Sequence, residues 1–193
     1  MTRDADTLEV RGGLWCDPAT GEPFTGPVEG RHPGGAMAWR GQLEQGRWHG
    51  RFERWFQDGS PHRVAHYDRG TPDGIQVLWD ESGHKKWEFT LVDGRQEGVV
   101  THWHPNGEKQ SEGTYRQGKP HGTVTHWYES GVKESEIAYV DGRREGAWVQ
   151  WYDNGQKESQ GEVRDGRKVG TWIRWDRDGT EAKRVDHGSP GDA

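Results

Sequence analysis

A period of 24 residues runs through most of this 193-residue chain and constrains its fold more than any other feature. Six tryptophans stand one period apart, at Trp55, Trp79, Trp103, Trp127, Trp151 and Trp175. Three series of glycines keep the same step, from Gly46 to Gly166, from Gly50 to Gly170 and from Gly59 to Gly179. Several residue series that share one period are typical of a repeat array, in which each unit packs mainly against its neighbours.

Each repeat has the pattern of a β-hairpin. After Gly146 the chain continues AWVQWY, a run of aromatic and β-branched residues typical of a strand, and then turns at DNG. The segments between glycines are too short for helices. A type I turn with a glycine bulge requires positive φ of the glycine alone, whereas a type I′ turn would impose it on Ser82 and Ser130. We therefore predict type I turns at these tight turns and expect the longer GRREG-type links to close the opposite edge.

The composition suits a thin structure better than a compact globule. Only 28% of the residues are hydrophobic, yet 12 are tryptophan, and each tryptophan can bury a large area. We predict an all-β fold, an elongated single antiparallel sheet of stacked β-hairpin repeats, with about seven units. The expected organisation is an N-terminal capping hairpin at 1–25, the repeat array at 26–184 and a flexible tail at 185–193.

Charge and cysteine content exclude several classes of protein. The net charge is −6 and no segment is polybasic, so binding to a nucleic-acid backbone has no support. The single cysteine, Cys16, excludes an intramolecular disulfide and suits a reducing compartment. No apolar stretch has the length of a signal sequence or a transmembrane helix. We expect a cytoplasmic protein.

The histidines are the residues that most resemble a site for chemistry. His102 and His104 are expected on one strand face, and His126 is the repeat equivalent of His102. Equivalent positions lie two strands, about 9.6 Å, apart, which is too far for His102 and His126 to share a metal ion. A thiol–imidazole pair between Cys16 and His32 has no further pattern to support it. We therefore expect no catalytic residue, no metal, no cofactor and no enzymatic activity.

The two long edges of such an array are expected to carry opposite charge. The GRREG-type links hold seven Lys or Arg against three Asp or Glu, whereas the tight-turn triplets hold one Arg against seven acidic residues. The alternative is that turns simply favour Asp. A further ladder places Lys85, Lys109, Lys133 and Lys157 three residues before Glu88, Glu112, Glu136 and Gln160. That ladder is either a charged comb for a partner or a solvated sheet face.

The periodic tryptophans are interpreted as ladder residues between repeats, with an exposed binding stripe as the alternative. Tyr115 and Tyr139 are expected to fill the gap between equivalent tryptophans. Candidate residues for binding a partner come from both the aromatic strand ends and the basic links. They are Trp79, Trp103, Trp127, Trp151, Trp175, Tyr128, Tyr152, Arg95, Lys119, Arg143, Arg144, Arg167 and Lys168.

The sequences GKPHG at 118–122 and GRWHG at 46–50, with the pattern W-Y-x-N/S-G-x-K-E at 127–134 and 151–158, resemble MORN repeats. The chain is most similar to the bacterial MORN variant of YwqK-like proteins, described as antitoxin components of toxin–antitoxin systems. This resemblance implies a non-enzymatic scaffold that binds another protein, a toxin, and neutralises it by occlusion. Eukaryotic MORN proteins are often associated with lipids, so contact between the basic links and an anionic membrane, or a purely structural scaffold, is the alternative.

Overall fold

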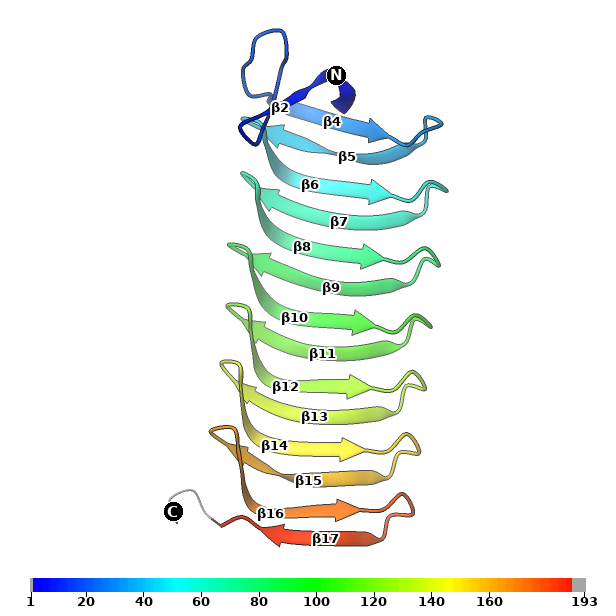
Figure 1. The fold of residues 1–193 in the computed structure, drawn as a ribbon, viewed down its shortest axis with the longest axis vertical. Helices are drawn as coiled ribbons and strands as arrows, with labels where there is room; N and C mark the ends of the chain where they lie inside the picture. The colour runs from blue at the N-terminus through cyan, green and yellow to red at the C-terminus, as the bar shows by residue number, and fades with distance from the viewer. Residues whose placement is uncertain (1, 189–193) are drawn as a thin grey trace. The chain divides into compact units, whose positions relative to one another are not determined.

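The computed structural model describes residues 2–188 and divides into two compact units, the first ending at Arg95 and the second beginning at Gln96 (Figure 1). In the first unit the strand order is β1-β4-β5-β6-β7-β8-β9, and in the second unit β10 to β17 follow chain order. The β1–β4 pair is parallel, and the other pairs within the two units are antiparallel. The predicted all-β fold of antiparallel hairpin repeats is confirmed in both units.

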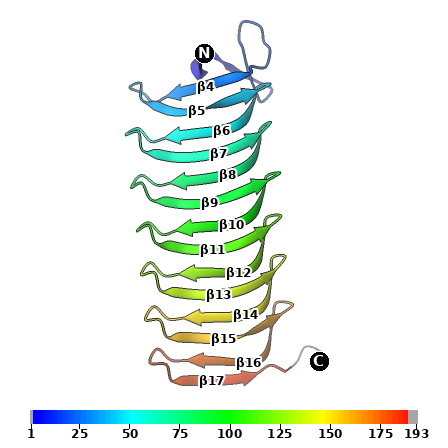
Figure 2. The same cartoon turned by 180° about the vertical axis from the view of Figure 1, so that it is seen from behind.

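The strands recur with the period of the sequence. The strands of the first unit are β1 (Arg3–Asp4), β4 (Gly26–Arg31), β5 (Met37–Glu44), β6 (Arg47–Trp55), β7 (Pro61–Asp68), β8 (Thr71–Trp79) and β9 (Lys85–Val92). Those of the second unit are β10 (Arg95–Trp103), β11 (Lys109–Arg116), β12 (Lys119–Trp127), β13 (Lys133–Val140), β14 (Arg143–Trp151), β15 (Lys157–Arg164), β16 (Arg167–Trp175) and β17 (Glu181–Asp186). Figure 2 shows the same succession from behind.

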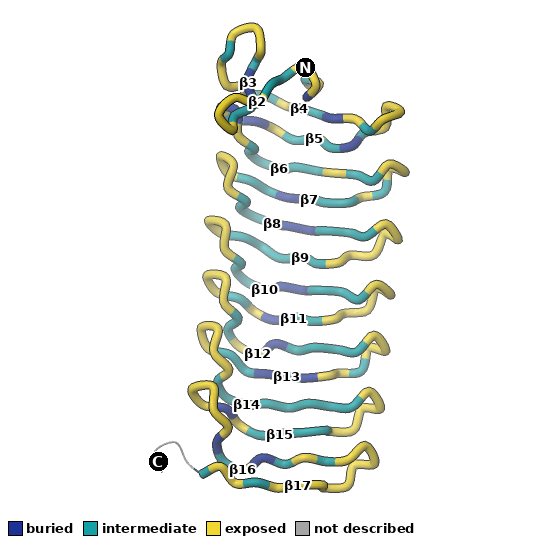
Figure 3. Tube along the Cα trace, viewed as in Figure 1, coloured by how far each residue is buried: buried dark blue, intermediate teal, exposed yellow. Residues whose placement is uncertain are grey.

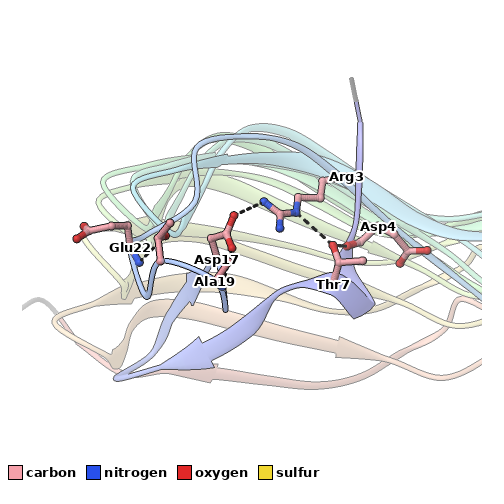
Figure 4. A network of polar contacts seen from close by, with 7 residues as sticks. Arg3, Asp4, Thr7, Asp17, Ala19 and Glu22 are labelled. Carbon is pink, nitrogen blue, oxygen red and sulfur yellow. Dashed lines mark hydrogen bonds and ion pairs between the residues drawn. The ribbon is translucent and has the colours of Figure 1, made fainter.

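The segment before the array contains a short hairpin. Strands β2 (Glu9–Arg11) and β3 (Leu14–Cys16) form a two-stranded sheet of their own, and a 3₁₀ turn covers Ala5–Thr7. Figure 4 shows how Arg3 holds this region together, since its guanidinium donates to Asp17 at 2.6 Å and to Thr7 at 3.2 Å. The hydrogen bond from Arg3 lowers the pKa of the Asp17 carboxyl.

At the other end, β17 continues to Asp186, two residues beyond the predicted end of the array at 184. Residues 189–193 of the predicted tail lie outside the described residues. Among residues 2–188, no helix combines the length and the apolar character needed to cross a membrane.

The tight turns are type I turns with a glycine bulge, as predicted. In the turn His104–Gly107, the amide of Gly107 donates to the carbonyl of His104 at 2.9 Å, and Pro105 occupies the first central position. Gly107 has a φ of 87°, whereas Ser82 and Ser130 keep negative φ. The glycine therefore takes the only strained backbone position of the turn.

The prediction for the opposite edge was wrong. The chain turns there over two residues, Asp141–Gly142, with φ of 48° and 87°, which is a type I′ turn. Val140 pairs directly with Arg143, so the link that was expected to close the hairpin is already part of β14. Asp tolerates the left-handed region because its short polar side chain bonds locally. Gly146, at a φ of 103°, sits where the register of β13 and β14 shifts and marks a β-bulge.

One face of the second unit is apolar. Register places its members opposite one another in the pairs Val100–Gly113, Val124–Ile137, Trp148–Gly161 and Trp172–Val185. We call the surface formed by these eight residues the apolar face. Val100, Val124, Ile137 and Trp172 are all buried on it. Figure 3 shows these buried stretches near the middle of the strands, with the turns exposed.

The first unit has an aromatic core beneath its N-terminal hairpin. The rings of Trp39 and Trp48 meet edge to face with centroids 5.5 Å apart, and Phe52 lies 5.0 Å from Trp48. Trp15, carried by β3, lies 6.1 Å from Trp48, so the hairpin packs directly on the array. Leu43 beside this cluster is fully buried. At this end of the array, packing against the aromatic core therefore takes the place of the packing that an inner repeat makes with its neighbour.

Candidate functional site

In the second unit the periodic tryptophans lie on the face opposite the apolar face, which we call the tryptophan face. In the second unit, the ammonium groups of Lys109, Lys133 and Lys157 lie 5.9, 5.9 and 6.0 Å from the ring centroids of Trp127, Trp151 and Trp175. These distances are typical of cation–π contacts. Each indole therefore contacts a lysine of the preceding strand. These tryptophans are half-buried contacts between repeats rather than a bare aromatic stripe.

The lysine ladder also binds acidic groups of its own strand. Lys109 pairs with Glu112 at 2.6 Å, and Lys133 pairs with Glu136. The charges of the tryptophan face are thereby largely balanced among its own residues. Trp79 and Trp103, the remaining predicted tryptophans, are half-buried as well.

The expected role of Tyr115 and Tyr139 was wrong. Tyr139 lies two residues from Ile137, and Tyr115 two residues from Gly113, so both tyrosines belong to the apolar face. Lysine side chains fill the gap between tryptophans instead, because they carry an apolar stem long enough to reach the next ring. Burial, with the nearby Tyr139, raises the pKa of Tyr115.

Tyr128 and Tyr152 clamp one repeat to the next. The hydroxyl of Tyr128 donates to the carbonyl of Trp151 at 2.8 Å, and that of Tyr152 donates to the carbonyl of Trp175 at 2.9 Å. His104 occupies the same repeat position, and its Nε2 lies 2.7 Å from the carbonyl of Trp127. In these three repeats the residue after the tryptophan thus bonds the strand end 23 residues further on.

We predict that Tyr152→Phe lowers the free energy of unfolding by about 0.5–1.5 kcal/mol, because it removes one hydrogen bond and leaves the ring in place. The result is to be measured by urea denaturation. Tyr67→Phe, whose ring packs against Phe52 in the first unit, serves as the matched control. Equal losses in the two variants would contradict the clamp.

The histidines take part in separate contacts. His102 Nδ1 lies 3.3 Å from the hydroxyl of Ser111, and His126 Nδ1 lies 3.2 Å from that of Ser135. Burial, with a smaller effect of the neighbouring His126, lowers the pKa of His102. His104 instead reaches the next repeat. In residues 2–188 no group of three His, Cys, Asp or Glu side chains is arranged to hold a metal ion.

The type I′ turns of the second unit form an edge with an excess of positive charge, which we call the basic edge. Its basic residues flank the three turns and are Arg116, Lys119, Arg143, Arg164 and Arg167. The turns contribute Asp141 and Asp165, and the carboxylates of Glu97 and Glu145 accept hydrogen bonds from the turn amides of Gln117 and Asp165. These nine residues have a net charge of +1, which rises to +3 when the exposed Arg144 and Lys168 are included. All five basic residues that flank the turns are exposed. The turns recur along one side of these hairpins in Figure 1.

Two further predicted residues fold back toward the apolar face. The guanidinium of Arg144 lies 4.9 Å from the ring centroid of Trp148, and the ammonium of Lys168 lies 4.0 Å from that of Trp172. These contacts shield the two indoles while leaving the charges exposed. Arg95 opens β10 and is also exposed, but it belongs to the first unit.

The opposite edge of the second unit is acidic. The segments between its strands at the bulge turns, 104–108, 128–132, 152–156 and 176–180, contain five Asp or Glu and one Arg. The Arg is Arg177, which pairs with Asp153 at 3.0 Å. The predicted charge difference between the two edges is therefore present in this unit, although several residues assigned to the links lie within strands.

Sequence reasoning missed the residues of the apolar face. Trp148 and Trp172 are not in the tryptophan series, yet they belong to a second series with the same period that includes Val100 and Val124. The sequence feature that could have identified them is a repeat position occupied by different apolar residues, valine or tryptophan, rather than by one residue type. Arg174 and Lys183, which face each other across β16 and β17, were also overlooked.

Comparison with known families agrees with this geometry. Residues 96–117, 120–141 and 144–165 match a family model described as a MORN repeat variant. Each match begins near a type I′ turn and ends within the next one, so the matched unit is one hairpin of the second unit. No curated protein matches the chain. The similarity supports a repeat scaffold, the class of module that binds proteins or membranes.

Proposed function

We propose that this chain is a non-enzymatic scaffold whose basic edge binds an acidic surface of a partner protein. The observation that carries the proposal is the recurrence of one exposed cation directly after each type I′ turn, at Lys119, Arg143 and Arg167. Equivalent residues stand two strands, about 9.6 Å, apart. A regular row of charges favours a partner with a matching row of carboxylates and speeds the encounter between the two.

We further propose that the partner is a toxin, which the scaffold neutralises in the cytoplasm by covering its surface. The resemblance of the repeats to those of antitoxin proteins supports this role. Occlusion requires an extended rigid surface and no chemistry. The basic edge supplies such a surface, because pairing between the strands holds its turns in place. The lone cysteine, which is buried, suits a reducing compartment.

The test is co-expression with the product of the adjacent gene, with growth and co-purification as readouts. We expect the wild-type chain to restore growth and to co-purify. Charge reversal at the basic edge, by Lys119→Glu with Arg143→Glu and Arg167→Glu, is expected to weaken the complex at least about tenfold, since each exposed ion pair contributes up to about 1 kcal/mol.

The matched control reverses three charges on the acidic edge, by Glu108→Lys with Glu129→Lys and Asp176→Lys. This variant is expected to keep the complex. A wild-type chain that neither co-purifies nor restores growth would contradict the antitoxin role. A complex that survives reversal of the basic edge would contradict the proposed surface.

A second candidate function follows from the same edge, because exposed lysines and arginines also attract anionic lipid headgroups by about 1 kcal/mol per residue. Flotation with phosphatidylserine vesicles, compared with pure phosphatidylcholine vesicles, distinguishes the two functions. Membrane binding predicts flotation with the anionic vesicles only, and its loss in moderate salt or in the basic-edge variant. Absence of any dependence on anionic lipid would remove this candidate.

A further inference from the structure

The last strand of the second unit presents an open edge. Strand β17 pairs with β16 on one side and is the final strand of the order, so within the described residues its other side has no strand partner. Open edges carry unpaired amide and carbonyl groups that can pair with an added strand. The same end of the unit also carries a group of cations that the other hairpins of the second unit lack at the equivalent positions.

The cations arise at a repeat position that is neutral in the other hairpins of the second unit, although Arg54 and Arg63 form the equivalent pair in the first unit. On the face that carries the apolar residues, the cross-strand pairs His102–Ser111 and His126–Ser135 are hydrogen-bonded, as are Gln150 and Ser159. The next pair in this series is Arg174–Lys183. Like charges directly opposite each other destabilise a sheet. Both side chains are exposed, and neither forms an ion pair within residues 2–188.

A pocket of about 320 Å³ lies beside this pair. Its lining includes Lys168, Trp172, Arg174, Lys183, Val185 and His187, and none of its lining residues is Asp or Glu. Trp172 and Val185 pair across the strands and form an apolar surface next to the cations. The pocket therefore combines positive charge with an apolar wall, and on β17 these come from Lys183 and Val185, two residues apart on the same face.

A second copy of the chain fits this edge poorly. In an antiparallel pair of β17 strands with full overlap, Glu181 would face Asp186 and Lys183 would face Arg184. Both contacts place like charges directly opposite each other. The ion pair between Arg184 and Glu181, at 2.7 Å, already satisfies these two charges within the strand. The edge thus disfavours self-pairing and leaves Lys183 for a partner of opposite charge.

We propose that β17 binds an extended acidic segment of another protein by strand addition. The added strand presents a carboxylate to Lys183 and Arg174 and, two residues away, an aliphatic side chain to Val185. Backbone hydrogen bonds hold the segment, and the alternating side chains select it. This site uses residues separate from those of the basic edge, so it is independent of the surface proposed above.

The test uses a fluorescently labelled peptide, TETVTETV, in which Glu and Val alternate on one strand face. Binding to the full chain is measured by anisotropy, and the site by amide hydrogen exchange. We expect binding and slower exchange at β17. Lys183→Glu is expected to weaken binding about tenfold, and Lys183→Gln somewhat less, because charge reversal adds repulsion to the lost attraction.

Matched controls separate this site from others. Arg184→Gln changes the neighbouring residue on the other face and should alter binding by no more than about twofold. The basic-edge variant should bind the peptide normally, so failure of one proposal remains distinguishable from failure of the other. The peptide TKTVTKTV should not bind, and TEPVTEPV, which lacks two amide donors, should bind weakly. Absence of TETVTETV binding, equal binding of the lysine peptide, or indifference to both Lys183 variants would overturn the proposal.

Discussion

Trp48→Ala is expected to lower the free energy of unfolding by about 3–5 kcal/mol, the usual cost of removing a large aromatic ring from a packed core. The ring of Trp48 has aromatic neighbours on three sides, with centroids 6.1 Å away at Trp15, 5.5 Å at Trp39 and 5.0 Å at Phe52. Its loss would leave a cavity that the flanking strands cannot fill, because their register is held by backbone hydrogen bonds. Urea denaturation measures the change.

The matched control is Trp55→Ala. Trp55 belongs to the periodic series, and its ring lies 5.3 Å from the guanidinium of Arg40 rather than inside the aromatic cluster. We expect this variant to lose less than half as much stability. Hydrogen exchange should show that Trp48→Ala opens the first unit preferentially, because contacts in a repeat array are mostly local. Equal decreases in the free energy of unfolding for the two variants would show that the aromatic cluster contributes no more to stability than the periodic tryptophans.

Gly161→Ala is expected to destabilise the second unit by about 1–3 kcal/mol or more through steric overlap. A Cβ at this position would lie 2.3 Å from both Cδ2 and Cε2 of Trp172. Gly161 has no positive φ, so its backbone is open to alanine and the expected loss comes from the ring alone. The indole cannot easily move, since its Nε1 donates to the carbonyl of Glu162 at 3.0 Å.

A double-mutant cycle isolates this contact. Trp172→Ala is itself destabilising, but Gly161→Ala should cost little once the indole is absent. Thermal unfolding of the two single variants and the double variant supplies the coupling energy. Simple additivity of the two losses would contradict the close packing of Trp172 on Gly161.

The predictions for the two kinds of turn show how much of the backbone conformation could be read from the sequence. The bulge turns were predicted correctly, because only the glycine at each turn can accept positive φ and Pro105 fits the first central position. The opposite turns were misplaced. Both Asp141 and Gly142 take positive φ there, and the second glycine, Gly146, serves a bulge within a strand. Two glycines four residues apart look like the ends of a loop, and only strand pairing shows otherwise.

The candidate site was recovered in part for a similar reason. The cations after the turns, such as Lys119 and Arg143, were identified because a turn exposes whatever side chain follows it. Tyr128 and Tyr152 were selected as partner-binding residues, but their hydroxyls donate to the next repeat. A sequence does not show which tyrosine hydroxyls reach a carbonyl 23 residues further on.

The sequence by itself determined that this chain is an all-β array of hairpins, since a strict 24-residue spacing of tryptophan and glycine leaves each unit too short to fold alone. Only the tertiary structure decided which side chains share a face, because a bulge shifts the alternation of a strand by one residue. It also decided that the tryptophans contact lysines, that Trp172 covers Gly161, and that Arg174 faces Lys183 at an open edge. These contacts join strands whose register depends on the hydrogen bonds between them.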